Sequence, residues 1–165
     1  MFSARALTFG TIWVALTLYV LALAIRIAWR DRLVRALWTA GCLFYLAHVA
    51  LAFQAFYRSS HAVAYLETAR QTAALFGIDW GGGLYFNYAF TAIWVGDTLW
   101  MWLGLDGYRN RPFWLAAAIQ IFMAFMAFNA TVVFAHGTTR TAGLIATALL
   151  IWLATRRKNF SREQT

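Results

Sequence analysis

Long runs of apolar residues, each interrupted by few charges, constrain this chain more than any other feature of its sequence. Hydrophobic residues fill 62% of the 165 positions and charged residues only 12%, whereas an ordinary soluble domain is about 45–50% apolar and about 25% charged. A water-soluble fold of this size keeps much of its surface exposed and could not bury so much apolar area. We therefore expect a single all-α domain over residues 1–165, a polytopic transmembrane helix bundle with the lipid bilayer as its solvent.

Five segments are long and apolar enough to be spans, since a helix crossing about 30 Å of hydrocarbon needs about 20 mostly apolar residues. The predicted spans are residues 8–28, 34–56, 84–105, 113–134 and 138–156. The fifth is short, but its flanking arginines can extend it by reaching toward the headgroups. A cleaved signal peptide is the alternative for the first span, because Ala22-Leu23-Ala24 loosely fits a cleavage site. Cleavage would leave the following arginine cluster outside, so we retain the span.

The basic residues predict an orientation, because Lys and Arg are retained on the cytoplasmic side of a membrane. With the N-terminus outside and the C-terminus cytoplasmic, the cytoplasmic segments hold ten of the 14 basic residues: Arg26, Arg30, Arg32, Arg35, Arg109, Arg111, Arg156, Arg157, Lys158 and Arg162. The outer side holds Arg5, Arg58, Arg70 and Arg140. The sequence thus predicts a multi-pass protein of the plasma (inner) membrane. Despite a net charge of +8, this clustering between apolar runs does not favour nucleic-acid binding, which uses a basic patch on a folded surface.

The outer segment 58–83 predicts one amphipathic helix on the outer face. Ser59 or Ser60 can cap its start and Gly77 can end it in the left-handed conformation, and Glu67 and Arg70 are spaced to pair. Its apolar stripe comprises Ala62, Leu66, Ala69, Ala73 and Phe76. Because most of these are alanines, we expect the helix to dock across the bundle and not to insert deeply into lipid.

Gly81-Gly82-Gly83 follows Asp79-Trp80 and leads into the third span. The three glycines lack the Lys-Ser/Thr that completes a phosphate-binding loop. They predict a turn by which the chain re-enters the bilayer. The alternative is a close approach of the backbone to a ligand or to another helix.

Polar side chains inside the predicted spans are functional candidates, because such groups are costly in hydrocarbon. The set comprises Asp97, Asn87, Gln120 and Asn129, together with Gln54 and His48. For Asp97 the expected partner is Arg26 or the amide of Gln120, in a structural pair that fixes helix register; the alternative is a proton or cation relay. Cys42, the only cysteine, is expected to be a small buried packing residue.

Three histidines, His48, His61 and His136, fall on the outer side or just below it. With Asp79 or Glu67 they could bind copper, zinc, iron or haem, for which imidazole is a suitable ligand. Their spacing is not that of a known site, since no H-x-x-x-H or Cys-x-x-Cys occurs, and a bis-histidine haem needs two facing histidines within spans. The cofactor is therefore unknown, with a metal ion or haem as the hypothesis.

Three functions remain open from the sequence. The leading prediction is a non-enzymatic subunit that packs with other membrane proteins, or with itself, through small-residue faces. The first alternative is a redox, haem or metal-handling membrane protein that uses the outer histidines. The second is a proton-coupled transport component centred on Asp97. No G-x-S-x-G motif or pair of facing carboxylates supports a hydrolase.

Overall fold

The computed structural model describes residues 4–26 and 31–162, which form helices joined by short turns and contain no strand. The helices are α1 (Ala4–Arg26), α2 (Asp31–Ala55), α3 (His61–Phe76), α4 (Gly83–Leu103), α5 (Leu105–Arg109), α6 (Phe113–Phe128), the π-helix η1 (Asn129–Val133) and α7 (Gly137–Arg162). The all-helical prediction is confirmed over the described residues. Each predicted span coincides with a helix of similar bounds, with η1 completing the fourth. The short α5 was not predicted.

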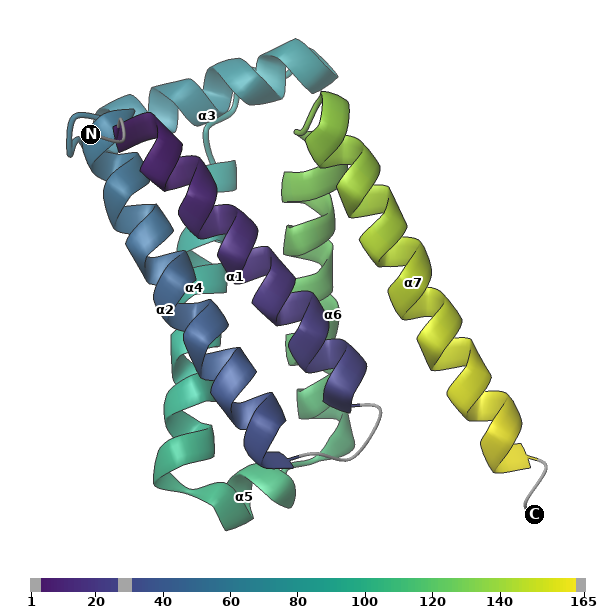
Figure 1. Ribbon diagram of the computed structural model, residues 1–165. Helices are drawn as coiled ribbons and strands as arrows, with labels where there is room; N and C mark the ends of the chain where they lie inside the picture. The colour runs from purple at the N-terminus through teal and green to yellow at the C-terminus, as the bar shows by residue number, and fades with distance from the viewer. Residues whose placement is uncertain (1–3, 27–30, 163–165) are drawn as a thin grey trace.

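The long helices α1, α2, α4, α6 and α7 run lengthwise between two ends of the molecule (Figure 1). Helix α3 crosses one end, hereafter the α3 end, and α5 lies at the other, the α5 end. Helix α1 begins at the α3 end and helix α7 ends toward the α5 end. Helix α7 starts beside η1 and then diverges from α6 toward its C-terminus.

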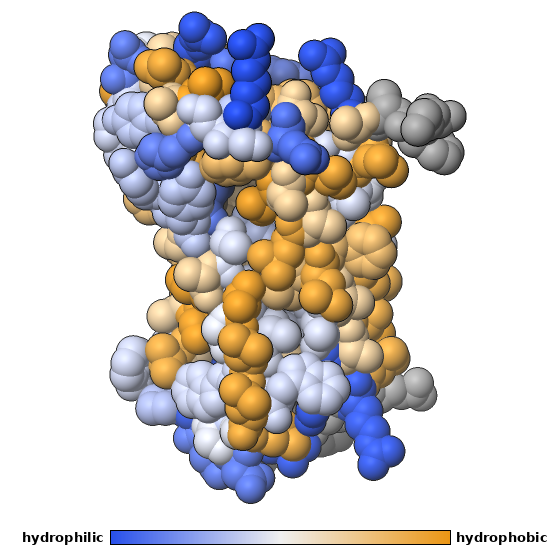
Figure 2. All heavy atoms as spheres, turned by 90° about the vertical axis from the view of Figure 1, so that its left-hand side faces the viewer, coloured by the Kyte–Doolittle hydropathy of each residue, from blue (hydrophilic) through white to orange (hydrophobic). Residues whose placement is uncertain are grey.

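Three segments of the described residues are long and apolar enough to cross a membrane: Ala4–Ile25, Arg32–Ala55 and Phe113–Val133. The apolar part of α7, Gly137–Leu153, is shorter. Helix α4 is not among the three, and its many Trp and Tyr residues together with Asp97 lower its mean hydropathy. Figure 2 shows apolar side chains over the middle of one face and hydrophilic ones at its two ends. These helices indicate a membrane-embedded protein.

An aromatic core joins α1, α2, α4 and α6. Its buried members are Ala15, Tyr19, Ala22, Trp38, Cys42, Tyr45, Phe90, Trp94, Met101 and Met123. Helices α1 and α2 pack closely at Gly41, where a Cβ would lie 3.1 Å from the Trp94 ring and 3.5 Å from the Ala15 carbonyl oxygen. Cys42 is buried, as expected for a packing residue.

Helix α3 has the predicted caps. Ser60 is extended (φ −110°, ψ 122°) and its side chain accepts a hydrogen bond from the Val63 N–H at 3.4 Å, and Gly77 ends the helix at φ 71°. Glu67 and Arg70 pair at 3.4 Å. The caps therefore follow from local backbone chemistry that the sequence displays directly.

The predicted apolar stripe of α3 is only partly the face that packs on the bundle. Leu66 is 57% exposed and Phe76 56% exposed, whereas Ala64 and Ala69 are buried. Small side chains on the inner face let α3 lie close to the turn before α4, and this leaves the larger apolar side chains outward. Hydrophobicity alone predicts the stripe, but the close approach of the two backbones favours the alanines Ala64 and Ala69 at the contact.

The glycine turn is held tightly against α3. A Cβ on Gly81 would lie 2.4 Å from the Tyr65 carbonyl oxygen, and one on Gly83 would lie 3.1 Å from the Thr68 methyl group. The Leu84 N–H donates to the Gly81 carbonyl at 3.1 Å as α4 begins. The segment is the predicted turn, and it is also the close approach of backbone to a helix that we had set out as the alternative.

Helix α6 ends in a π-turn in which the Phe134 N–H donates to the Asn129 carbonyl at 2.9 Å. This turn presents Thr131 to α7, where a Cβ on Gly143 would lie 2.7 Å from the Thr131 side chain and 2.8 Å from its carbonyl oxygen. Gly143 therefore permits the contact that holds the start of α7. At the other end of α6, Pro112 occupies the N-cap position.

Candidate functional site

The site nearest the α5 end is built by the last turns of α4 and the chain that returns from it. Helix α4 turns one face into the core, and Asp97 lies on it between Trp94 and Met101. Gly104 (φ −148°) ends the helix, and its N–H donates to the Trp100 carbonyl at 3.0 Å. The single turn of α5 then reverses the chain before Pro112 starts α6. This reversal carries Tyr108 and Arg111 back toward Asp97.

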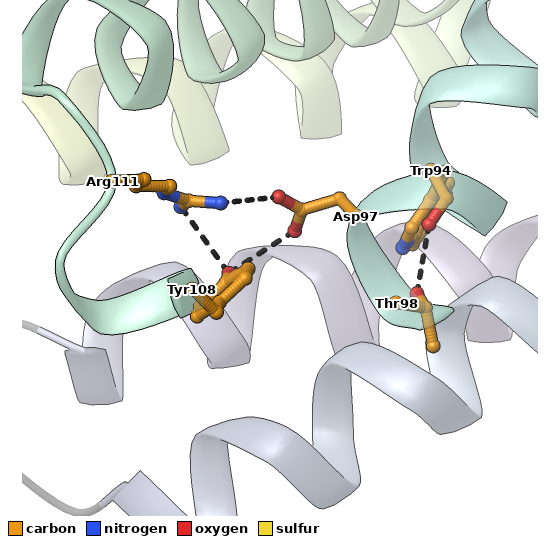
Figure 3. A network of polar contacts seen from close by, with 5 residues as sticks. All are labelled: Trp94, Asp97, Thr98, Tyr108 and Arg111. Atoms are coloured by element: carbon orange, nitrogen blue, oxygen red, sulfur yellow. Dashed lines mark hydrogen bonds and ion pairs between the residues drawn. The ribbon is translucent and has the colours of Figure 1, made fainter. Parts of the chain in front are cut away.

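Asp97, Tyr108 and Arg111 form a closed triangle of polar contacts (Figure 3). The Arg111 Nη1 lies 2.5 Å from Asp97 Oδ1, the Tyr108 hydroxyl donates to Asp97 Oδ2 at 3.1 Å, and Arg111 Nη2 donates to the Tyr108 hydroxyl oxygen at 3.2 Å. The Arg111 guanidinium also lies 3.9 Å from the centroid of the Tyr108 ring. Both carboxylate oxygens are thus occupied.

The ion pair in this triangle is removed from solvent. The side chains of Arg111 and Asp97 are only 3% and 0% exposed. Burying either charge alone is very unfavourable, whereas a pair with good geometry and additional hydrogen bonds offsets most of that cost. The arrangement ties the chain after α5 to the inner face of α4, which suits it to fixing the register of these segments.

The structure gives Asp97 two partners that the sequence did not predict. Arg111 holds the carboxylate, with Tyr108 as the second donor, and the amide of Gln120, one of the predicted partners, has no hydrogen-bond partner among the described residues. The side chain of Arg26 lies outside the described part. From the sequence, Arg111 is one of the basic residues expected at the cytoplasmic surface. The signal missed was the short interval from Gly104 to Pro112, which permits only one turn of helix before the chain returns.

The three histidines have separate surroundings. His48 Nδ1 is 2.9 Å from the Thr8 carbonyl oxygen and links α2 to α1. His61 Nδ1 is 2.9 Å from the Tyr88 hydroxyl, with the two rings stacked at 5.8 Å, and His136 is exposed between η1 and α7. Within residues 4–26 and 31–162, no group of three or more His, Cys, Asp or Glu side chains could hold a metal ion. Metal binding by these histidines therefore has no geometric support in that part of the chain.

The remaining polar candidates lie at different places in the bundle. Asn129 donates its amide to the Phe125 carbonyl at 2.8 Å, where α6 passes into η1. Asn87 is exposed, and its carbonyl accepts from Thr91. Gln54 is also exposed. Gln120 is different, because both atoms of its side-chain amide are buried without a hydrogen-bond partner among the described residues.

Comparison of the chain with protein-family models, with curated proteins and with solved structures finds no match.

Proposed function

We propose that this protein is a five-span membrane protein of the plasma (inner) membrane that serves as a non-enzymatic subunit of a membrane complex. Its N-terminus lies outside and its C-terminus in the cytoplasm. Three apolar helices of sufficient length support the membrane placement. Among described side chains, Arg32, Arg35 and Arg109 are carried near the α5 end, which favours that end as the cytoplasmic one.

The position of α7 is the main support for an assembly role. Its first turns are held by the contact between Gly143 and Thr131, and beyond them it diverges from α6 (Figure 1). Ile145 and Ile151 on this helix are 64% and 60% exposed. Helices in a bilayer gain van der Waals packing where they lie in contact along their length. Helix α7 also contacts α1, but its exposed apolar side chains lack this packing within the chain, and we infer that a helix of another membrane protein supplies it.

The buried triangle supports a structural role better than a transport role. A carboxylate that relays protons or cations needs access to a path and freedom to change its partners. Asp97 instead has no exposed side-chain surface, and both its oxygens are held. We therefore assign Asp97 to the internal support of the subunit.

Site-specific photocrosslinking in native membranes tests the assembly role. A photoreactive residue at Ile145 or Ile151 is expected to give a discrete protein adduct of defined mass, and the same protein should co-purify in fixed ratio in mild detergent. Leu43, which is 62% exposed on α2, is the matched control and should give no such adduct. If both α7 positions crosslink only to lipid, the assembly role is wrong; an adduct of twice the chain mass would identify the partner as a second copy.

Metal analysis and an optical spectrum of the same detergent preparation address the metal and redox alternative. We expect no stoichiometric metal and no Soret band. A stoichiometric metal or a haem spectrum would displace the structural proposal. Reporter tags at the two termini test the topology, and tags that report the same compartment would refute it.

A further inference from the structure

An arginine at the α5 end lies over an exposed tryptophan and takes no part in the Asp97 triangle. The guanidinium carbon of Arg35, on α2, lies 3.8 Å from the centroid of the Trp102 ring, on α4, and Trp102 is 54% exposed. No carboxylate among the described side chains is in ion-pair contact with Arg35. A guanidinium has five N–H donors, and those of Arg35 remain available to an acceptor from outside the described part of the chain.

Trp102 is itself fixed, so that it forms an ordered platform for Arg35. Its indole N–H donates to the Thr39 hydroxyl at 3.0 Å, and this hydroxyl donates to the Arg35 carbonyl at 2.8 Å. The three residues thus form a closed set of contacts between one turn of α2 and the last turn of α4. Because α2 holds the ring through two of its residues, the guanidinium over the ring has a defined place at the surface.

An exposed apolar surface continues from this cluster toward the middle of the bundle. Leu43 lies one turn beyond Thr39 on α2, and Leu99 lies one turn before Trp102 on α4, each on the same helix face as its neighbour. The two leucines are 62% and 52% exposed. Figure 2 views the side of the molecule on which α2 and α4 lie, and it shows apolar side chains over the middle of this face. A ligand here would meet a cation at the end of the bundle and apolar side chains next to it.

This combination matches a phospholipid with an anionic headgroup. Guanidinium groups bind phosphate oxygens through charge-assisted hydrogen bonds, and the cytoplasmic leaflet of a membrane carries the negative surface charge that attracts basic residues. Arg32 is exposed one turn before Arg35 and adds a second positive charge on the same side of α2. The exposed leucines suit acyl chains, whereas an acidic soluble peptide would leave them without a partner.

We propose that Arg35, Thr39 and Trp102 form a binding site for the headgroup of an anionic phospholipid of the inner leaflet. Arg35 donates to the phosphate oxygens, and Trp102 holds the guanidinium at the level of the headgroups. The acyl chains of this lipid lie along Leu43 and Leu99. The assignment to the inner leaflet rests on the proposed function, in which the α5 end is cytoplasmic.

Native mass spectrometry of the full-length protein in mild detergent tests this site, with phosphatidylglycerol and phosphatidylcholine as the probes. We expect the first phosphatidylglycerol to bind about tenfold more tightly than phosphatidylcholine, and Arg35→Gln should remove this preference. Arg5→Gln is the matched control, because Arg5 also lies over an aromatic ring, 5.8 Å from the Phe56 centroid at the α3 end. It removes the same charge from the opposite end and should leave the preference unchanged.

Two further variants distinguish a structured site from general attraction of charge. Arg35→Lys keeps the charge but loses the planar fork of donors, and Trp102→Leu keeps every charge but removes the platform. Both should weaken phosphatidylglycerol binding, and the proposal is overturned if both bind it as wild type does. Arg35→Lys decides the question if circular dichroism shows that Trp102→Leu does not fold.

Two results with the wild-type protein would also overturn the proposal. The first is equal binding of the two lipids. The second is displacement of phosphatidylglycerol by inorganic phosphate at constant ionic strength, which would identify a free anion as the ligand. Binding in detergent needs neither a partner protein nor a given orientation in a membrane. Its failure would therefore remove the lipid site alone, whereas failure of the crosslinking or of the terminal tags would leave the lipid affinities unchanged.

Discussion

Removing Arg111 alone should destabilise this protein far more than removing the whole buried triangle. Arg111→Met leaves the Asp97 carboxylate buried without its counter-charge, and breaking such a pair from one side costs about 3–5 kcal/mol. This is roughly a 10²- to 10⁴-fold change in the folded-to-unfolded ratio. Solvent does not screen this ion pair appreciably, because the Arg111 and Asp97 side chains are only 3% and 0% exposed.

Replacing the charges together should recover most of that loss. Asp97→Leu with Arg111→Met removes both charges, and adding Tyr108→Phe removes the hydroxyl that otherwise loses both of its bonds to them. A buried ion pair replaced by apolar residues of similar volume is often neutral or stabilising. We expect the triple variant to lie within about 1–2 kcal/mol of wild type, allowing for imperfect repacking.

The assay is reversible unfolding in mixed micelles by titration with SDS, followed by tryptophan fluorescence and circular dichroism. Glu67→Gln is the control, because it breaks an ion pair whose Arg70 and Glu67 side chains are 78% and 40% exposed and should cost at most about 1 kcal/mol. The reasoning is refuted if Arg111→Met costs no more than this control, or if the triple variant is as unstable as the single one.

Three glycine positions give further predictions in the same unfolding assay. Gly143→Ala should destabilise by about 1–3 kcal/mol, because the new Cβ meets the Thr131 side chain and backbone at 2.7–2.8 Å; an unchanged midpoint would show that α7 is not held there. Gly81→Ala should cost at least as much, since the Tyr65 carbonyl oxygen lies 2.4 Å from the added atom, and a neutral result would contradict the close packing of this turn on α3. Gly96→Ala has no atom within 4 Å of the new Cβ and should be neutral or more stable by up to about 1 kcal/mol; a clear loss would indicate an unrecognised contact at this exposed position.

The sequence predicted the helices well because their signals are local. Apolar runs of bilayer length marked the long helices, and Ser60 and Gly77 marked the ends of α3. The contacts between elements were harder to predict. Arg111 resembled every other arginine near the membrane surface until α5 returned it to Asp97, and the choice of inner face on α3 depended on a close approach that hydrophobicity does not measure.

The packing of Tyr19, Trp38 and Trp94 in the core also could not be predicted from the sequence. A tryptophan near the end of a span commonly meets the headgroups, and Trp38 lies near the start of the predicted span 34–56, but the structure buries it against Tyr19 and Trp94. Hydropathy describes how a residue partitions between water and lipid. It does not describe which rings from different helices will pack against one another.

The π-turn at Asn129–Val133 can absorb a one-residue change in the length of this chain. Such a turn is an α-helix that accommodates one additional residue, so a single deletion within it can restore regular helix and leave α7 facing the same way. A deletion elsewhere in a long helix would rotate everything beyond it by about 100° and, in α6, would turn Thr131 away from Gly143. Insertions or deletions of one residue are therefore expected to be tolerated better at this turn than within α1, α2 or α4.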